Sequence, residues 1–288
     1  MHYQIACFLK NVLRGTLAGA ALVYVCSASL AQGVGDLLIA PTRVVFDGQR
    51  RTAEINLINI GEKPATYRIS LIHQRMNDDG KLEEIQTPGD GEQFADELIR
   101  FTPRQVELMP HVAEMVRIQL RLPAELASDE FRSHLLFRAV PTGAPLEDKA
   151  GAANSQQGLS IKLTPIYGVS IPVIVRHSKM ASVSTFTDLK LKASPDGTPV
   201  LTGRIARTGN GSVYGDIVVT FGRAGGKFVQ VGKVAGIAVY TPNAGRTFAI
   251  KLTPKSASEL ADGTLRVAYR QASADGNGNL AEASIAMP

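Results

Sequence analysis

The segment Leu159–Val175 carries the residues whose spacing is best suited to chemistry, and that chemistry is binding. Every odd-numbered residue in it is apolar, aromatic or proline, so an extended strand would have one apolar face. Such a strand would span about 55 Å, against about 17–20 Å for an ordinary strand. We expect part of it to lie at a sheet edge, where its backbone and apolar row are offered to another chain. Pro165 and Pro172 agree with an edge, because proline is excluded from central strands.

No catalytic or metal-binding pattern accompanies that segment. The histidines at positions 73, 111, 134 and 177 are scattered, without i, i+4 pairing or a neighbouring carboxylate motif, whereas metal sites depend on such spacing. The chain has no G-x-S-x-G elbow, Walker loop or dinucleotide-binding glycine pattern. Asp78-Asp79-Gly80 lacks the glutamate that would complete a calcium loop, and a hairpin turn explains it better. We expect no enzyme, no cofactor and no metal.

The N-terminus predicts export. Lys10 and Arg14 precede the apolar run Leu17–Val25, and Ser29-Leu30-Ala31 offers a small-x-small cleavage site. These features together are typical of a secretory signal. A membrane anchor is the alternative, but the apolar run is well short of the about 18–20 residues that an anchor needs. We expect cleavage after Ala31, so that residues 1–31 are removed and the mature chain is not inserted in a membrane.

Both cysteines, Cys7 and Cys26, lie in the segment that we expect to be removed. Tyr24 and Val25 are poor neighbours for a lipid-attached cysteine. The mature chain is therefore expected to have no disulfide and no thiol nucleophile. Its formal net charge falls from +5 to +3 when the two basic residues of the signal are lost. Its arginine pairs lack interleaved aromatic residues, which argues against nucleic-acid binding.

Short β-strands are the elements that would position the alternating segment. Runs rich in Val, Ile, Thr, Tyr and Phe alternate with turn signals along the whole chain, and strands at this spacing predict an all-β fold of two immunoglobulin-like β-sandwich domains in tandem. The expected strands are 36–40, 43–46, 51–60, 65–74, 99–108, 113–122, 133–140 and 159–175 in the first half, then 182–193, 199–208, 213–221, 227–240, 246–252, 264–271 and 280–286.

The boundary between the two sandwiches is expected near residues 176–179, which gives domains at 32–176 and 177–288. Residues 141–158 are rich in Gly, Ala, Pro and polar residues and predict a loop between two strands of the first domain rather than a linker. The chain has no Trp, so the Cys…Trp…Cys pattern of antibody domains is missing. The sandwiches are therefore expected to belong to the looser immunoglobulin-like class.

Three segments resemble, in their order, the PapD-like periplasmic chaperones of the chaperone–usher pilus pathway. The first is Pro41–Gly48, with an arginine, two apolar residues and a turn; the second combines Ile99–Pro103 with Leu108–Arg117, where His111 stands at a place common for glycine. The third is Asp129–Pro141, followed by the loop and the alternating segment. The resemblance covers most of residues 36–176 and is mostly architectural beyond them. It implies a periplasmic chaperone that stabilises pilus or fimbrial subunits by donor-strand complementation and delivers them to an outer-membrane usher.

The resemblance also implies which residues bind a subunit. The alternating segment corresponds to the strand that the family lends to its subunits, while its part Ile171–Val175 is expected to pack in the protein's own core. Arg43 corresponds to the family's cleft arginine, which binds the C-terminal carboxylate of the subunit. The side chains expected to enter the subunit are Ile161, Leu163, Tyr167 and Val169.

One position departs from the family's pattern. The family pairs its cleft arginine with a lysine on the long strand. Aligning Arg176 with the arginine that ends the family's strand puts Pro172 at the lysine position, and a shift by two puts Ser170 there. Lys162 lies well upstream. Either carboxylate binding rests on Arg43 and backbone N–H groups, or the chain is a divergent subtype with a different anchor.

Two other classes of protein are alternatives. A pilus structural subunit or adhesin would begin with an alternating donor extension, and only Gln32–Gly35 precedes the first expected strand of the mature chain. An exported enzyme with an immunoglobulin-like accessory domain would need a catalytic domain, and none is left once both sandwiches are counted. For a chaperone, the exposed strand also predicts a homodimer in which two copies cap each other when no subunit is bound.

Overall fold

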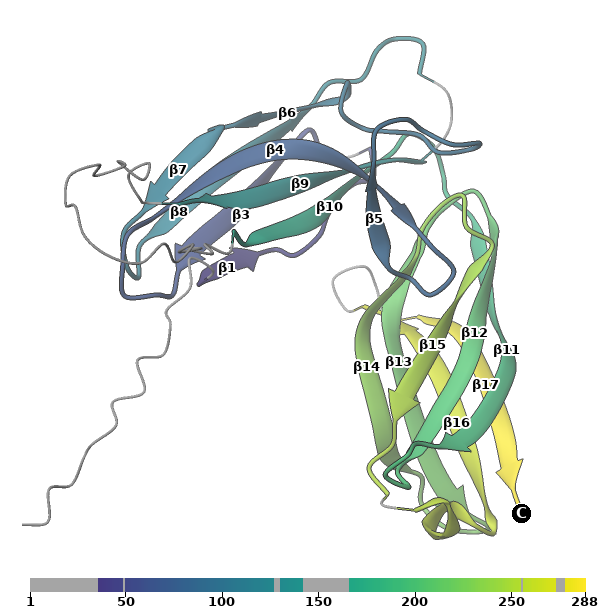
Figure 1. The fold of residues 1–288 in the computed structure, drawn as a ribbon. Helices are drawn as coiled ribbons and strands as arrows, with labels where there is room; N and C mark the ends of the chain where they lie inside the picture. The colour runs from purple at the N-terminus through teal and green to yellow at the C-terminus, as the bar shows by residue number, and fades with distance from the viewer. Residues whose placement is uncertain (1–35, 49, 127–129, 142–165, 255, 273–277) are drawn as a thin grey trace, which may run out of the picture. The chain divides into compact units, whose positions relative to one another are not determined.

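The computed structural model describes residues 36–48, 50–126, 130–141, 166–254, 256–272 and 278–288. Within them the chain forms seventeen β-strands and one short 3-10 helix, Ala257–Leu260, and no α-helix. No helix in this part of the chain is long and apolar enough to cross a bilayer. The predicted all-β fold is therefore confirmed, and the strands form two β-sandwiches (Figure 1). The expected signal segment, residues 1–31, lies outside the described residues.

The first sandwich is built from the first ten strands. They are β1 Leu37–Ala40, β2 Val44–Phe46, β3 Thr52–Asn59, β4 Ala65–Met76, β5 Leu82–Ile85, β6 Ile99–Thr102, β7 Gln105–Leu108, β8 Ala113–Leu120, β9 Glu130–Val140 and β10 Gly168–Arg176. One sheet has the order β1-β3-β8-β6, and the other has the order β2-β10-β9-β4-β5, with β7 also paired to β4. The first strands thus lie in different sheets, and the chain changes sheet between β1 and β2.

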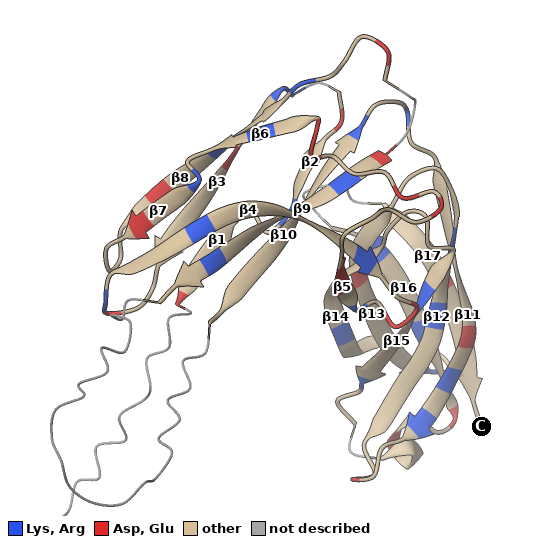
Figure 2. Ribbon diagram, turned by 45° about the horizontal axis from the view of Figure 1, so that its top comes forward, with Lys and Arg blue, Asp and Glu red and all other residues tan. Residues whose placement is uncertain are grey.

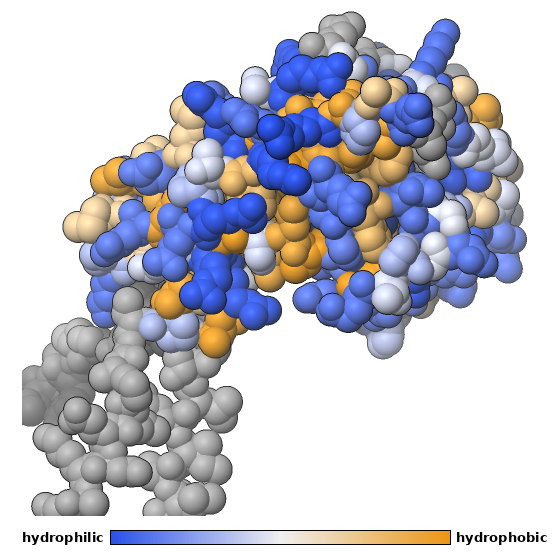
Figure 3. Space-filling model, turned by 90° about the horizontal axis from the view of Figure 1, so that it is seen from above, coloured by the Kyte–Doolittle hydropathy of each residue, from blue (hydrophilic) through white to orange (hydrophobic). Residues whose placement is uncertain are grey.

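Period-two alternation places one face of each of these sheets in a shared core. Leu135 and Phe137 of β9 are fully buried, and Ile171, Val173 and Val175 of β10 belong to the same cluster. This part of the alternating segment therefore packs in the protein's own core, as expected. Burial of each such side chain stabilises the fold by about 1.5–3 kcal/mol. On the face shown in Figure 3, other apolar side chains reach the surface among hydrophilic ones.

The second sandwich is built from the remaining strands. They are β11 Ser182–Ala193, β12 Pro199–Gly209, β13 Val213–Arg223, β14 Val229–Val239, β15 Gly245–Lys251, β16 Gly263–Gln271 and β17 Asn279–Met287. The sheets have the orders β11-β12-β15 and β14-β13-β16-β17. Their core includes Leu201, Ile205 and Tyr269, whose hydroxyl donates to the carbonyl of Ile237 at 2.8 Å. All seven strands match the predicted ones to within about two residues.

The structure departs from the sequence prediction in the first sandwich. The hairpin strand β5 was not predicted, because Leu-Glu-Glu-Ile is short and half charged; it pairs with the end of β4. Residues 99–108, predicted as one strand, form β6 and β7 in different sheets. The buried residues change from odd numbers at Phe101 to even numbers at Val106, and Pro103 between them has no N–H for a ladder. The chain therefore crosses between the sheets at this proline.

The alternating segment forms a shorter strand than predicted in the part that the structure describes. Ile166 and Tyr167 precede β10, and residues 159–165 lie outside the described residues. The expected boundary near residue 176 falls between β10 and β11. Residues 33–288 form one compact unit, so the division into domains at 32–176 and 177–288 stays a prediction.

His111 has a backbone conformation that favours glycine. It lies in the turn between β7 and β8 with a φ of 60°, which is in the left-handed region. Its N–H donates to the carbonyl of Asn59 at 2.8 Å and so joins the turn to the end of β3. The geometry of this turn explains why glycine suits the position in the family that the sequence resembles.

We expect His111→Gly to stabilise the protein by about 0.5–1 kcal/mol. Relief of left-handed strain, about 1–2 kcal/mol, outweighs the cost of glycine's extra chain entropy, about 0.5–1 kcal/mol. The replacement also removes the contact between Nε2 of His111 and Oε1 of Glu62, which are 3.6 Å apart. Both side chains are exposed, so this contact contributes little to stability. Urea unfolding measures the change. Val112→Gly is the control, because Val112 has no positive φ and its replacement should destabilise; a destabilised His111→Gly would contradict the prediction.

Candidate functional site

β10 has an open edge along its first half. It pairs with β9 over its whole length, from Gly168 opposite Arg138 to Arg176 opposite Glu130. On its other side it pairs only with β2, in parallel, and only over residues 173–175. Residues 168–172 of β10 therefore have a strand neighbour on one side only among the described residues. An edge of this kind offers its backbone to an added strand.

The hydrogen-bond pattern shows which backbone groups face that edge. Ala139 donates its N–H to the carbonyl of Tyr167 at 2.9 Å, so odd-numbered residues of this strand direct their N–H and C=O groups at β9. Gly168 and Ser170 therefore direct theirs at the open edge. Pro172 is also even-numbered. The N–H that proline lacks would have faced the open edge, so the ladder with β9 loses no hydrogen bond at this position.

The apolar row leaves the core along the same stretch. Ile171 is 2% exposed, whereas Val169 is 41% exposed and Tyr167 is 50% exposed. The three residues are two apart, so their side chains share one face of the strand. Of the four residues predicted to enter a subunit, Tyr167 and Val169 thus lie at the surface beside the open edge. Ile161 and Leu163 lie outside the described residues.

Arg43 lies in a small cleft beside the buried end of β10. Its guanidinium carbon is 4.5 Å from the ring centroid of Tyr214, a cation–π contact. Arg43 and Arg176 line the same cavity of about 280 Å³, together with Ser182 and Ser212. Two guanidinium groups at one cavity suit an anion, and their planar forks suit a carboxylate.

Of the two positions at which the resemblance would put the family's lysine, Pro172 and Ser170, Pro172 lies closer to Arg43. Val44 pairs with Val173, and the same frame puts Arg43 beside Pro172, which carries no charge. Ser170 lies further from Arg43 along β10, and its hydroxyl donates to the side chain of Gln74 at 3.3 Å. Arg176 is the second basic residue at the cleft, and the sequence analysis did not predict that role.

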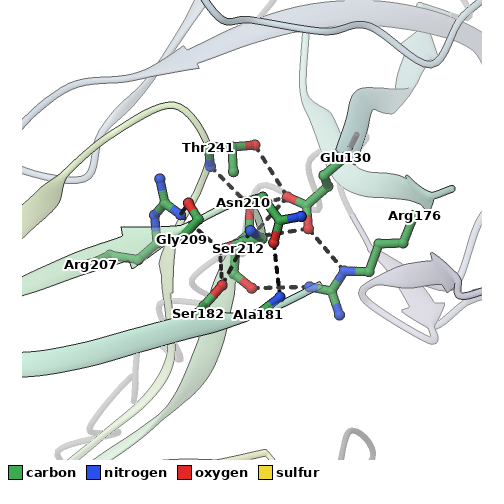
Figure 4. A network of polar contacts seen from close by, with 10 residues as sticks. Glu130, Arg176, Ala181, Ser182, Arg207, Gly209, Asn210, Ser212 and Thr241 are labelled. Carbon is green, nitrogen blue, oxygen red and sulfur yellow. Dashed lines mark hydrogen bonds and ion pairs between the residues drawn. The ribbon is translucent and has the colours of Figure 1, made fainter. Parts of the chain in front are cut away.

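Glu130, the first residue of β9, is the centre of a buried polar network (Figure 4). Its side chain is 0% exposed and accepts a hydrogen bond from Nε of Arg176 at 2.9 Å. The same carboxylate accepts from the backbone N–H and hydroxyl of Ser212 and from the hydroxyl of Thr241. Arg176 also donates from Nη2 to the carbonyl of Ser212 at 3.0 Å. The network fixes the direction of the Arg176 guanidinium at the cleft.

Three polar residues share one face of β9, where they are buried. Glu130, Arg132 and His134 are 2%, 6% and 1% exposed. The Arg132 guanidinium stacks 4.2 Å from the ring centroid of Tyr240. Burial, and then the charges of Arg132 and His73, lower the pKa of His134 to about 3, so its ring is neutral at pH 7. The sequence analysis missed this buried face, for which the polar residues at every second position from 130 to 134 are the available signal.

The residues that the structure describes hold no group of His, Cys, Asp and Glu side chains arranged for a metal ion. The four histidines among the described residues lie on separate elements or turns. His73 stacks on Phe94 and approaches Asp96 at 3.4 Å, and His111 approaches Glu62 at 3.6 Å. The expectation that the protein is not an enzyme stays a prediction.

No protein-family model matches the chain, and a search of curated proteins finds no relative. Solved structures are similar to it. A chain of the CsuC–CsuE chaperone–tip adhesion subunit complex from Acinetobacter baumannii has a TM-score of 0.45 and 13% identity, over 88% of this chain and 99% of that one. The Pseudomonas aeruginosa CupB2 chaperone has a TM-score of 0.42 and 15% identity, over 87% and 100%. The YadV chaperone has a TM-score of 0.41 and 15% identity, over 87% and 98%.

All three sequence identities are below 25%, so these comparisons show a likeness of fold alone. Two of these three proteins are chaperones, and the third comes from a complex of a chaperone with a tip adhesion subunit.

We expect Glu130→Ala to destabilise the protein by about 3–5 kcal/mol, because it leaves the partly buried Arg176 without its carboxylate. Urea unfolding followed by circular dichroism measures the loss. Glu54→Ala is the matched control: Glu54 pairs with Arg117 at 3.2 Å, with both side chains about half exposed, and its loss should cost about 0–1 kcal/mol. Equal effects of the two replacements would contradict the prediction.

We expect His134→Leu to reduce the loss of stability on acidification. The unfolded histidine binds a proton below about pH 6.5, whereas the folded one does so only near pH 3. The unfolded state therefore binds more protons between these values, and stability falls as pH falls through that window. At pH 5.5 this group alone accounts for about 1.4 kcal/mol. Unfolding free energies of both proteins at pH 7.5 and 5.5 measure the difference; identical pH dependence would contradict the prediction.

Proposed function

We propose that this protein is a periplasmic, PapD-like chaperone that binds and stabilises pilus subunits by donating a strand to them. The observation that carries the proposal is the first half of β10, where an open backbone edge and an apolar row that leaves the core occur together. Its support in the sequence is the ordered set of three motifs over residues 36–176. The partner that fits this edge is a protein with an incomplete sandwich and an apolar groove.

Backbone and side chains have separate parts in the proposed complex. Gly168 and Ser170 supply N–H and C=O groups for a ladder with a strand of the subunit, and Pro172 ends the donor groups on that edge. Tyr167 and Val169 enter the groove, followed by Ile161 and Leu163 further upstream. Each side chain that becomes fully buried stabilises the complex by about 1.5–3 kcal/mol. The ladder therefore sets the register, and the apolar side chains supply much of the affinity.

The cleft supplies the anchor for the subunit's C-terminal carboxylate. Arg43 binds it through its guanidinium, and Arg176 stands in for the lysine that the family's pattern would place at Pro172 or Ser170. Glu130 offsets one of the two positive charges, which leaves a net positive cleft for one carboxylate. The chain is thus a divergent subtype in its anchor.

The finer parts of the function follow from the same resemblance. The chaperone delivers its subunits to an outer-membrane usher, needs no cofactor and acts in the periplasm after removal of residues 1–31. Residues 32–176 carry the donor strand and Arg43. Residues 177–288 supply the other wall of the cleft through Ser182, Ser212 and Tyr214.

Co-expression with a candidate pilus subunit in a Gram-negative periplasm tests the proposal. We expect the tagged wild-type chain to yield a one-to-one complex and Tyr167→Asp/Val169→Asp to abolish it, since each replacement puts a charge in an apolar groove. Ile161→Asp/Leu163→Asp should do the same. Val183→Asp/Val229→Asp is the matched control, because these valines are 65% and 63% exposed on other strands, and the complex should persist.

Arg43→Ala tests the anchor in the same experiment. It should weaken the complex by about 1.5–3 kcal/mol, the contribution of a hydrogen bond to a charged group. The amount of intact subunit in the periplasm measures chaperone action independently of the pull-down. If the wild type captures no subunit and the subunit is equally stable without it, the proposed function is wrong and the structural-subunit alternative gains.

A further inference from the structure

A cavity of about 490 Å³ lies at the end of the first sandwich, where the chain continues to the second. Both sheets stop there: β2 and β10 end at Phe46 and Arg176, and β8 ends at Leu120. Val175 pairs with Phe46 in the parallel ladder, and the turn after β2 and the segment 176–179 line the cavity together. The cavity is therefore built where segments far apart in the sequence meet.

Basic side chains gather around this cavity. Its lining includes one acidic residue, Asp47, and four residues that are basic or histidine: Arg51, Arg176, His177 and Lys179. Leu122 also lines it and packs against the core of the first sandwich. The cavity thus combines an apolar contact with the core and an excess of positive charge, a pattern suited to a small anionic ligand.

Three of these groups, Arg51, His177 and Lys179, have no ion pair with any residue that the structure describes. Figure 2 shows Lys and Arg on strands of both sandwiches, and a single exposed base is ordinarily a solvated surface charge. Here, charges of the same sign from separate segments line one concavity, where they repel one another and raise the local positive potential. Binding of an anion relieves that repulsion.

Arg176 brings an oriented guanidinium to the cavity. Its side chain is 23% exposed, and it donates from Nε to Glu130 at 2.9 Å and from Nη2 to the carbonyl of Ser212 at 3.0 Å. A guanidinium has five N–H donors, so these two bonds hold its direction and leave donors for a ligand. Because Glu130 neutralises this arginine, the excess charge of the cavity comes from Arg51 and Lys179, of which Asp47 offsets one.

The turn after β2 leaves space beside these groups. Gly48 has a φ of 93°, in the left-handed region that favours glycine. A Cβ at this position would meet no atom within 4 Å, so no side chain fills the space next to the turn. The cavity is many times larger than the about 30 Å³ that one water occupies in the liquid. It therefore has room for a ligand larger than a single hydrated ion.

The donors that line the cavity suit a phosphate group. An arginine fork binds oxyanions bidentately, a lysine adds a compact charge, and an imidazole N–H donates a further hydrogen bond. A phosphate group offers three acceptor oxygens and a charge of about −1.5 to −2 at pH 7. A carboxylate offers two oxygens and one charge, so it would use fewer of these donors.

We propose that this cavity binds a phosphate group, either of a free phosphate compound or of a lipid headgroup. Arg51 and Lys179 pair with the phosphate oxygens, and His177 donates a hydrogen bond to them. The site goes beyond the proposed function and does not depend on it. It is separate from the donor strand and shares only Arg176 with the Arg43 cleft.

Titration of the mature chain with sodium pyrophosphate, followed by two-dimensional NMR, tests the proposal. We expect the amide signals of Gly48 and Ser178 to shift saturably, and the binding to weaken with added salt. Arg51→Ser/Lys179→Ser should weaken binding about tenfold, the loss expected for two exposed charge pairs. Lys179→Arg keeps the charge and should bind like the wild type.

The matched control is Arg68→Ser/Lys227→Ser, which removes one exposed arginine and one exposed lysine that do not line the cavity. It should bind like the wild type. Unchanged binding by Arg51→Ser/Lys179→Ser, an equal loss in the control, or absence of saturable shifts at millimolar pyrophosphate would overturn the proposal. So would equally strong binding of acetate, which would make the cavity a site for any small anion.

Lipid vesicles distinguish the two sources of the phosphate group. Co-sedimentation with vesicles that contain phosphatidic acid, lost in Arg51→Ser/Lys179→Ser and absent with phosphatidylcholine alone, would assign the site to a lipid headgroup. Binding of pyrophosphate without such co-sedimentation would assign it to a free phosphate compound. Either result supports the proposal, because both ligands present the same group to the cavity.

Discussion

The hydrogen-bonded register between β9 and β10 is the constraint that positions every part of the candidate site. Because the Ala139 N–H meets the Tyr167 carbonyl, the odd residues of β10 bond to β9 and the even ones face the open edge. The same period of two sends Val173 into the core of the first sandwich and Ile174 into the cluster of the second. A slip of one residue would exchange all these roles.

That register also explains the cleft. Arg176 lies directly opposite Glu130, so the cross-strand pair forms at the end of the ladder, where the second sandwich buries it. A buried ion pair stabilises little by itself, since desolvation offsets its Coulomb attraction. Here the N–H and hydroxyl of Ser212 satisfy the remaining acceptor sites of the carboxylate. The pair therefore holds the Arg176 guanidinium in one orientation beside Arg43 at the cleft. A solvent-exposed arginine would not be held in this way.

The sequence by itself determined the strands, because alternation and turn residues act locally: every strand of the second sandwich and the alternating face of β10 followed from it. It did not determine the crossing at Pro103, the short β5, the buried polar face of β9 or the meeting of Arg43 with Arg176. These depend on pairing and packing between residues far apart in the chain. Only the tertiary structure decided them, because the same arginine is a surface charge or a cleft residue according to what packs beside it.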